Sequence, residues 1–240
     1  MLDKASNLLL TQLIAPGYMP GFLGSPAETA AGALDTLGFD LVGVVQGIDF
    51  KGLFGQEAVP YGVVAKQRLT GALFCAIRGT DSVKEWLEDG WAVPEPWPFA
   101  GHTHKGFTDI YETLTVSGVK LATFLADSGV TVTGHSLGAA LAHLLAADLG
   151  KSCRACVSFE GPRVGDGEFC AWMDSRVLTY RYVIIGDVVP HAPPENLGYT
   201  HPGIEIDLDP AGLIPLTLDP EVYLLSHHQL AYVQALLEKA

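Results

Sequence analysis

Residues 130–143, with the sequence VTVTGHSLGAALAH, limit the possible folds of this chain more than any other stretch. Alternating valines and threonines predict a short buried strand, and leucines and alanines at helical spacing predict a helix directly after it. Between them lies a G-x-S-x-G pattern centred on Ser136, in which glycines without a Cβ let the backbone turn sharply around the serine. We therefore expect Ser136 in a strained turn with its hydroxyl within reach of solvent; a plain tight turn is the alternative.

Two backbone N–H groups could stabilise an oxyanion beside Ser136. The N–H of Leu137 lies at the start of the predicted helix, where amides lack intrahelical acceptors and the helix dipole favours negative charge. Thr80 directly follows another predicted strand, and its hydroxyl and N–H could supply a second donor. The alternative role for Thr80 is to cap the short helix that follows.

That short helix, predicted over residues 82–89, places Trp86 and Leu87 on an apolar face. Two turns of helix are too short to be stable alone, so the segment must dock or move. Aromatic and proline residues continue the apolar character to Phe99. We expect a lid over the site at about residues 82–99, and a packed surface loop is the alternative.

Length and composition indicate one domain spanning residues 1–240, large enough to bury its core without disulfides. Charged residues make up 17% and hydrophobic residues 48%, which favours a well-packed globule. The net charge of -13 argues against binding to nucleic acid or anionic lipid, and its simplest consequence is solubility. No apolar run is long enough to span a membrane, and the first residues lack the apolar core of a secretory leader. We therefore expect no stable membrane anchor, and a cytoplasmic protein unless a leader has been removed or export takes another route.

Cysteines and paired histidines are the candidates for a metal site. Cys153 and Cys156 form a lone C-x-x-C, but the apolar alternation around them predicts a strand on which they would face opposite sides. No second ligand pair stands at metal spacing, so we expect buried free thiols. His102 and His104 have no acidic or cysteine partner nearby in sequence, and we expect no metal there either.

Apolar spacing and turn residues predict the remaining elements. Helices are expected over residues 4–13, 25–37, 107–127 and 220–238. Strands are expected over residues 40–48, 59–69 and 71–77, as an antiparallel meander, and over residues 153–159 and 176–185. Strands that alternate with helices after residue 100 predict an α/β fold with a mostly parallel sheet.

Asp187 is the candidate acid of a catalytic triad, because it follows a buried strand at the end where α/β sheets build their sites. An exposed loop aspartate is the alternative, and Asp166, Asp174, Asp207 and Asp209 are less well placed competitors. For the base, position along the chain leaves His201, His227 and His228, and proximity to the last helix favours the adjacent pair.

Five motifs occur in order between residue 71 and the C-terminus: RGT with SVKEWL after it (78–87), HKGF (104–107), TGHSLGAALA (133–142), GPRVG (161–165) and DVVPHAPP (187–194). Together they make the chain similar to the class 3 lipases, which include small secreted fungal triacylglycerol lipases and bacterial and plant relatives. The resemblance implies an α/β-hydrolase fold, whose central, mostly parallel sheet is flanked by helices and topped by a short helical lid.

The resemblance also implies roles for individual residues. Ser136 corresponds to the nucleophile, Asp187 to the acid, and Thr80 and Leu137 to the oxyanion hole. Trp86 corresponds to the lid that opens at lipid surfaces, with Leu87 beside it. In many relatives the base precedes a tyrosine by five positions, and here Tyr232 assigns that role to His227. A spacing of three, found in other relatives, falls on Gln229, so His228 remains the alternative.

These roles predict ester hydrolysis through an acyl-enzyme, without cofactor or metal. We expect a triacylglycerol lipase that acts on lipid esters in transient contact with a lipid interface. An esterase for soluble short-chain, aryl or feruloyl esters is the first alternative. The others are a phospholipase and a non-catalytic binding protein on a hydrolase scaffold.

Overall fold

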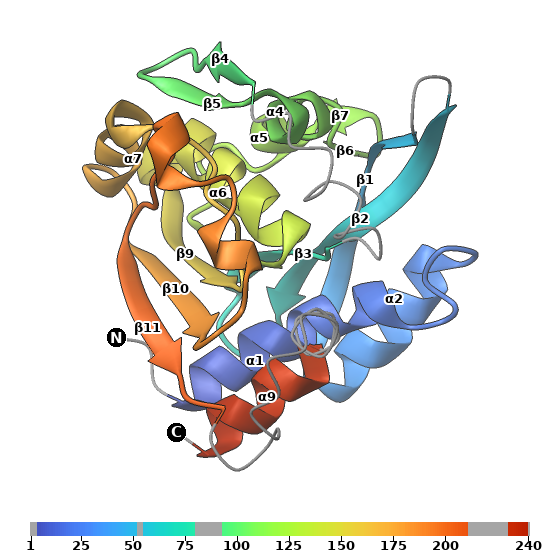
Figure 1. The fold of residues 1–240 in the computed structure, drawn as a ribbon. Coiled ribbons are helices and arrows are strands. Elements are labelled where there is room, and N and C mark those ends of the chain that lie inside the picture. The colour runs from blue at the N-terminus through green and yellow to red at the C-terminus, as the bar shows by residue number, and fades with distance from the viewer. Residues whose placement is uncertain (1–3, 52–54, 80–92, 211–229, 240) are drawn as a thin grey trace.

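The computed structural model describes residues 4–51, 55–79, 93–210 and 230–239. Across these ranges, nine strands form one large sheet with helices on both of its faces (Figure 1). Its strands, in spatial order, are β11 (Ile204–Leu208), β10 (Thr179–Ile184), β9 (Cys153–Phe159), β8 (Val130–His135), β3 (Leu73–Ile77), β2 (Gly55–Gln67), β1 (Phe39–Lys51), β6 (Thr115–Val116) and β7 (Val119–Lys120). A second sheet consists of β4 (Pro94–Pro96) and β5 (His102–His104).

The strand directions place the candidate site. Neighbouring strands from β11 to β3 run parallel, while β3, β2 and β1 form the antiparallel meander that the sequence predicts. Since parallel strands end at the same edge of a sheet, the residues that follow β3, β8, β9 and β10 come together there. Those residues include Gly79, Ser136, Glu160 and Asp187.

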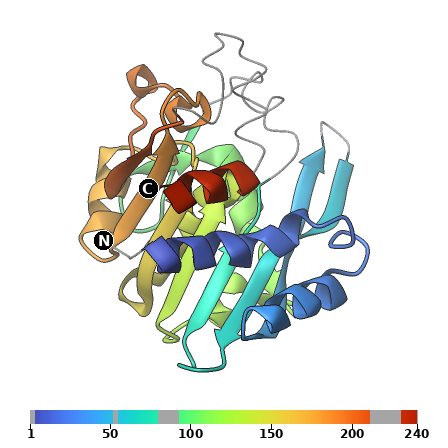
Figure 2. The ribbon, with the colours of Figure 1, turned by 90° about the horizontal axis from the view of Figure 1, so that it is seen from below.

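Helices pack two apolar cores against the two faces of the sheet. One face carries α4 (Lys105–Glu112), α5 (Leu121–Phe124), α6 (Leu137–Leu149) and α7 (Gly167–Asp174). The other carries α1 (Lys4–Ile14), α2 (Pro26–Thr36) and α9 (Leu230–Lys239). Figure 2 shows α1 in blue and α9 in red lying side by side across the strands. Most of α6 is buried, which suits a helix of leucines and alanines without a polar face.

The predicted long helix over residues 107–127 is wrong. The chain instead forms α4, the hairpin of β6 and β7, and the short helix α5. Ser117 and Gly118 both have positive φ, 51° and 79°, as a two-residue hairpin turn requires. The apolar residues that suggested a helix, such as Leu114 and Leu121, are buried as expected, but on a different backbone. Spacing alone did not reveal the hairpin because its strands have only two residues each.

The expected opposite orientation of Cys153 and Cys156 is also wrong. The register of β9 against β8 shifts after Cys153, which pairs with Val130, so that Ala155 pairs with Thr131. This bulge inserts one extra residue and turns both thiols into the same core cluster, which also contains Cys75. All four cysteines are free and buried, as predicted.

The other described elements follow the sequence closely. α1 and α2 begin and end within about a turn of the predicted bounds, although the Ser25 side chain makes no capping hydrogen bond. β10 begins at Thr179 rather than at residue 176. The last predicted helix is described only from Leu230. None of the described helices has the length and apolarity that crossing a bilayer requires.

Candidate active site

The turn from β8 into α6 holds Ser136 in the predicted strand–turn–helix arrangement. Ser136 has φ 58° and ψ -127°, a conformation that non-glycine residues rarely adopt, at a cost of about 1–3 kcal/mol. Its N–H donates to the Phe159 carbonyl at 3.0 Å, which ties the turn to β9. Its carbonyl oxygen accepts from Ala139 N–H at 2.9 Å, within the first turn of α6.

Two glycines are needed because backbone crosses backbone at this turn. A Cβ on Gly134 would lie 2.1 Å from the Gly138 carbonyl oxygen, and one on Gly138 would lie 2.3 Å from the Ile77 carbonyl oxygen. Both distances are far shorter than any real carbon contact. The glycines therefore let β8, α6 and the end of β3 meet directly beneath Ser136.

The Ser136 hydroxyl does not have the solvent exposure that the sequence predicts. The residue is 1% exposed, and within the described ranges Oγ has no hydrogen-bond partner. One cause lies in the chain after β3, since a Cβ on Gly79 would stand 2.9 Å from the Ser136 Cβ. The hydroxyl is thus held in a buried position beside the N-terminus of α6, where the Leu137 N–H lies in the first turn.

A hydrogen-bonded chain connects the end of β3 to the residue before Ser136. Gly79 N–H donates to the Tyr18 hydroxyl oxygen at 2.6 Å, and that hydroxyl lies 2.7 Å from His135 Nδ1. The Arg78 guanidinium adds bonds to the Pro60 and Gly79 carbonyl oxygens at 2.9 and 2.8 Å. Thr80, the predicted oxyanion donor that comes next, lies outside the described residues.

Asp187 lies just beyond β10, as predicted, after Gly186 with φ 96°. It is 2% exposed, and its Oδ1 accepts the Val189 N–H at 2.9 Å. Of the competing aspartates, two accept hydrogen bonds from backbone N–H groups and two are exposed. Asp166 caps α7 through the N–H groups of Glu168 and Phe169, Asp174 accepts the N–H of Gly203, and Asp207 and Asp209 are exposed.

A second buried carboxyl group, Glu160, lies beside Asp187 and was not identified from the sequence. Glu160 follows β9, has φ 52° and is fully buried. Its Oε1 accepts the Ile184 N–H at 2.7 Å, and its carboxyl lies close enough to Asp187 for the two groups to influence each other's protonation, although Oε2 has no hydrogen bond of standard geometry among the described residues. Burial, and then the charge of Asp187, raise the pKa of Glu160 well above its usual range, which favours the neutral form.

Three described histidines have partners other than Ser136. His201 donates from Nε2 to the Pro190 carbonyl oxygen at 2.7 Å, and burial lowers its pKa to about 3. His143 is buried, with Nε2 3.0 Å from Ser158 Oγ. His102 pairs with Asp166 at 3.0 Å. The predicted base His227 and its alternative His228 lie outside the described residues.

The predicted lid is described only at its C-terminal end, because Trp86, Leu87 and the rest of residues 82–92 lie outside the described ranges. Trp97 is 5% exposed, and its ring packs edge-on against Phe169 and at a tilt against Tyr111. β4, just before it, pairs with β5. This end of the predicted segment is therefore anchored in the core.

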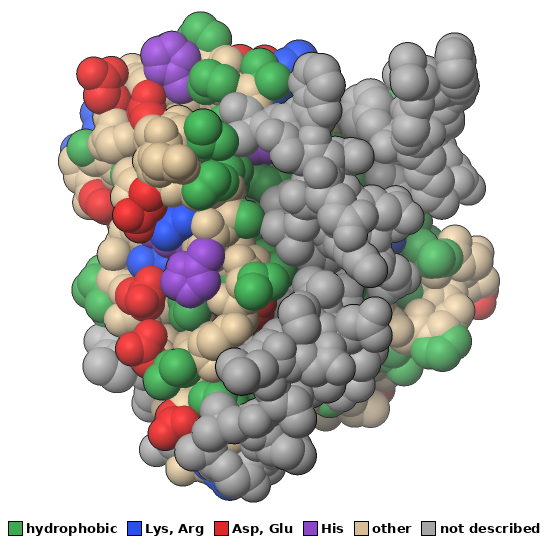
Figure 3. Space-filling view, in the orientation of Figure 1, with side chains coloured by type: hydrophobic (Ala, Val, Ile, Leu, Met, Phe, Trp, Pro, Cys, Tyr) green, Lys and Arg blue, Asp and Glu red, His purple; other side chains and the backbone are tan. Residues whose placement is uncertain are grey.

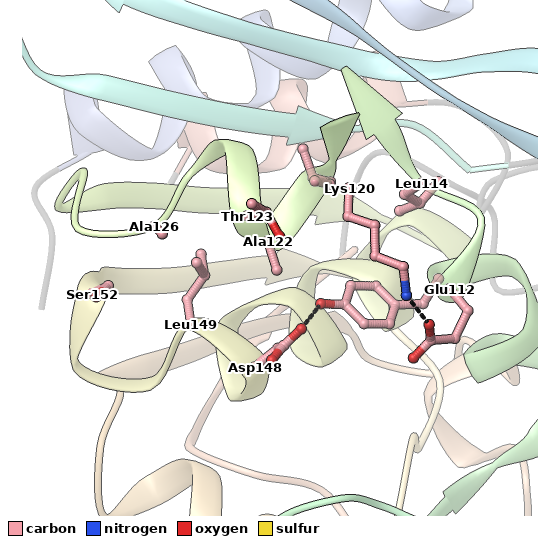
Figure 4. Close-up of a pocket in the computed structure, with 11 residues that line it drawn as sticks. Glu112, Leu114, Lys120, Ala122, Thr123, Ala126, Asp148, Leu149 and Ser152 are labelled. Carbon is pink, nitrogen blue, oxygen red and sulfur yellow. Dashed lines mark hydrogen bonds and ion pairs between the residues drawn. The ribbon is translucent and has the colours of Figure 1, made fainter. Parts of the chain in front are cut away.

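A pocket of about 370 Å³ lies between α4, α5, the β6–β7 hairpin and the end of α6 (Figure 4). Its charged groups are paired with other lining residues: Tyr111 donates to Asp148 at 2.5 Å, and Lys120 to Glu112 at 2.8 Å. None of its lining residues belongs to the site around Ser136. In the described part of the chain, no group of three or more His, Cys, Asp or Glu residues is arranged to hold a metal ion.

The face of the molecule in Figure 3 carries scattered acidic side chains with apolar ones between them. Exposed apolar residues follow β10, where Ile185, Val188 and Leu197 each remain about half exposed. The segment after β10 thus exposes apolar side chains next in sequence to the buried Asp187.

Comparison with known proteins identifies the family. The class 3 lipase family model matches residues 74–197, more than half of the chain. The lipase of Rhizomucor miehei is 35% identical over 159 residues, which cover 60% of this chain and 43% of that one. A secreted mono- and diacylglycerol lipase of Malassezia restricta, LIP4, is 37% identical over 108 residues, covering 42% of this chain and 35% of that one. The chain spans about two fifths of the length of the curated relatives it matches.

Solved structures agree with the sequence relatives. The native propeptide complex of Rhizomucor miehei lipase superimposes with a TM-score of 0.69 at 26% identity, covering 87% of this chain and 69% of that one. A triacylglycerol lipase described as having a serine protease triad at its catalytic centre superimposes with a TM-score of 0.68 at 26% identity, covering 85% and 80%. The predicted α/β-hydrolase fold is confirmed, and the chain belongs to the class 3 lipase family.

Proposed function

We propose that this protein is a serine ester hydrolase for lipid esters, acting as a triacylglycerol lipase. The observation that carries the proposal is the turn at Ser136, where a strained φ of 58°, a buried hydroxyl and the N-terminus of α6 coincide. Residues in strained backbone conformations cluster at active sites, and the strain at Ser136 coincides with the start of a helix. The relatives named lipase, and mono- and diacylglycerol lipase, support lipid esters as the substrate class.

In the proposed mechanism, His227 removes the proton of the Ser136 hydroxyl as its oxygen attacks the ester carbonyl carbon. The carbonyl oxygen becomes an oxyanion, stabilised by the N–H of Leu137 and by Thr80. Each such donor lowers the barrier by about 3 kcal/mol. The imidazolium of His227 then protonates the leaving alcohol, and the acyl group stays on Ser136.

Deacylation reverses these roles. His227 takes a proton from water, the resulting hydroxide attacks the acyl carbon, and the proton returns to Ser136 as the carboxylic acid leaves. Asp187 orients the imidazole and stabilises its charged form. No cofactor takes part in any step, and Trp86 and Leu87 are proposed to contact the acyl chain from the lid.

The test is hydrolysis of p-nitrophenyl esters from acetate to palmitate by the parent and by Ser136→Ala, His227→Ala and His228→Ala. The proposal predicts losses of at least about 10³-fold for the first two variants and a small change for the third. If His228→Ala is the inactive histidine variant, His228 is the base and the rest of the mechanism stands. Parent-like activity in Ser136→Ala would overturn the mechanism.

A soluble-substrate esterase is the second candidate, and triglyceride emulsions separate the two. A lipase should increase in rate once tributyrin exceeds its solubility limit. Simple saturation with soluble butyrate esters, and no hydrolysis of emulsions, would leave only the esterase activity.

A further inference from the structure

We propose that Tyr18 is a positioning residue that holds the chain after β3 against the turn at Ser136, and so fixes the oxyanion site. The inference rests on the proposed ester hydrolysis. It concerns a residue outside residues 74–197, the range matched by the family model. Tyr18 ends the short 3-10 helix η1 (Ala15–Tyr18), which continues directly from α1.

The Tyr18 hydroxyl joins two backbone segments that are far apart in sequence. Gly79 N–H donates to the hydroxyl oxygen at 2.6 Å, and the same hydroxyl is hydrogen-bonded to His135 Nδ1, 2.7 Å away. The Tyr18 ring also meets the His135 ring edge-on, with centroids 5.7 Å apart.

Gly79 is closely packed against both Tyr18 and the turn at Ser136. A Cβ on Gly79 would stand 2.8 Å from the Tyr18 hydroxyl, 2.9 Å from the His135 carbonyl oxygen and 2.9 Å from the Ser136 Cβ. One residue earlier on each side, a Cβ on Gly17 would stand 2.7 Å from the Arg78 Cβ. The residues at positions 78 and 79 are thus enclosed between η1 and the turn at Ser136.

The two hydrogen bonds of the Tyr18 hydroxyl lie next to the residues proposed to act in catalysis. Gly79 immediately precedes Thr80, and His135 immediately precedes Ser136. One hydroxyl therefore sets the spacing between the segment proposed to donate to the oxyanion and the segment that carries the nucleophile. Catalytic geometry must hold within about 0.5 Å, and a misplacement of about 1 Å can lower the rate about 100-fold.

The test compares Tyr18→Phe with a matched control, Tyr199→Phe. Tyr18 is partly buried and Tyr199 is buried, and within the described ranges the Tyr199 hydroxyl has no hydrogen-bond partner. Turnover of p-nitrophenyl butyrate is measured per active site, with sites counted by a stoichiometric phosphonate ester. We expect Tyr18→Phe to lower kcat per titrated site by about 10- to 100-fold with KM within about threefold. Tyr199→Phe should stay within twofold of the parent in both.

Counting active sites separates a positioning role from a merely structural one, because misfolded molecules are not counted. If Tyr18→Phe only reduces the number of titratable sites and leaves kcat per site within twofold, the proposal is overturned. Should Tyr18→Phe not fold, His135→Leu removes the bond between the Tyr18 hydroxyl and the turn while leaving the bond from Gly79, and it must lower kcat per site at least fivefold. A kcat per site within twofold of the parent for His135→Leu would equally overturn the proposal.

Ser136→Ala distinguishes this failure from failure of the proposed function. If Ser136→Ala is inactive while Tyr18→Phe turns over like the parent, only the positioning role is lost. If Ser136→Ala keeps the activity, the proposed function is wrong, and the role of Tyr18 is wrong with it.

Discussion

His201 should make the protein lose stability in acid, and replacing it with glutamine should remove that loss. Burial, followed by the charge of Arg181, lowers the pKa of His201 from 6.5 to about 3. The ring stays neutral in the folded protein, donating from Nε2 to the Pro190 carbonyl oxygen. His201→Gln keeps an N–H donor near Nε2 but does not titrate.

The free energy of unfolding falls in acid because the unfolded chain binds a proton at His201 more readily than the folded protein does. A base whose folded pKa is lowered contributes stability that is complete above its unfolded pKa of 6.5 and is lost as the pH falls through the folded pKa of about 3. Between pH 7 and pH 4.5 the unfolded chain takes up a proton at this site while the folded protein does not. That difference is worth about 2.5 kcal/mol, and we expect about 2 kcal/mol after allowing for the partial exposure of the ring.

Urea unfolding of the parent and His201→Gln at pH 7.0, 5.5 and 4.5 measures this term directly. The free energy of unfolding of the parent, relative to the variant, should fall by about 2 kcal/mol from pH 7.0 to 4.5, equivalent to about 4–8 °C in Tm for a chain of this size. Equal pH dependence in the two proteins would refute the reasoning. The same variant should keep at least half of the ester hydrolase activity at pH 7.5, and an inactive His201→Gln would mean that His201, not His227, is the base.

Three further outcomes are expected. Gly138→Ala should lose about 1–3 kcal/mol of unfolding free energy and at least tenfold in kcat, because its Cβ would stand 2.3 Å from the Ile77 carbonyl oxygen. The control is Gly167→Ala, whose Cβ would have nothing within 4 Å. Equal effects of the two substitutions would contradict the tight packing at the turn. Because burial raises the pKa of Glu160, the contribution of this group to stability is complete below its unfolded pKa near 4.5 and is lost as the pH rises. Thermal unfolding from pH 4 to 8 should therefore show the parent losing stability relative to Glu160→Gln. Parallel stability profiles of the two proteins would contradict this. None of the four buried thiols should react with Ellman's reagent at pH 8 until denaturant is added, and rapid reaction of the native protein would contradict their burial.

Features that depend on local sequence were predictable. The G-x-S-x-G turn imposes its own backbone, since Gly134 and Gly138 have no room for a side chain. The position of Asp187 just beyond β10 was predictable because a buried apolar strand precedes it, while its role as the acid stays a prediction. The antiparallel meander followed from alternation and from turn residues between long strands.

Features that depend on contacts distant in sequence were not predictable. Tyr18 and His135 are separated by 117 positions, and no pattern around Tyr18 marks it as a partner of the turn. Glu160 directly precedes the GPRVG motif, but only the structure shows that β9 and β10 bring its carboxyl near Asp187. The bulge at Cys153 follows from the register of β9 against β8, which the sequence of β9 alone does not encode.

Covalent labelling of Ser136 tests the proposed mechanism most directly. The parent and Ser136→Ala are treated with a long-chain p-nitrophenyl phosphonate, which forms a stable bond to an activated serine, and the adduct is located by peptide mass spectrometry. We expect one adduct per molecule, on the peptide containing Ser136, with complete loss of ester hydrolysis, and no adduct in Ser136→Ala. An adduct on another residue that abolishes activity, or full labelling of Ser136 with activity retained, would contradict the assignment of Ser136 as the nucleophile.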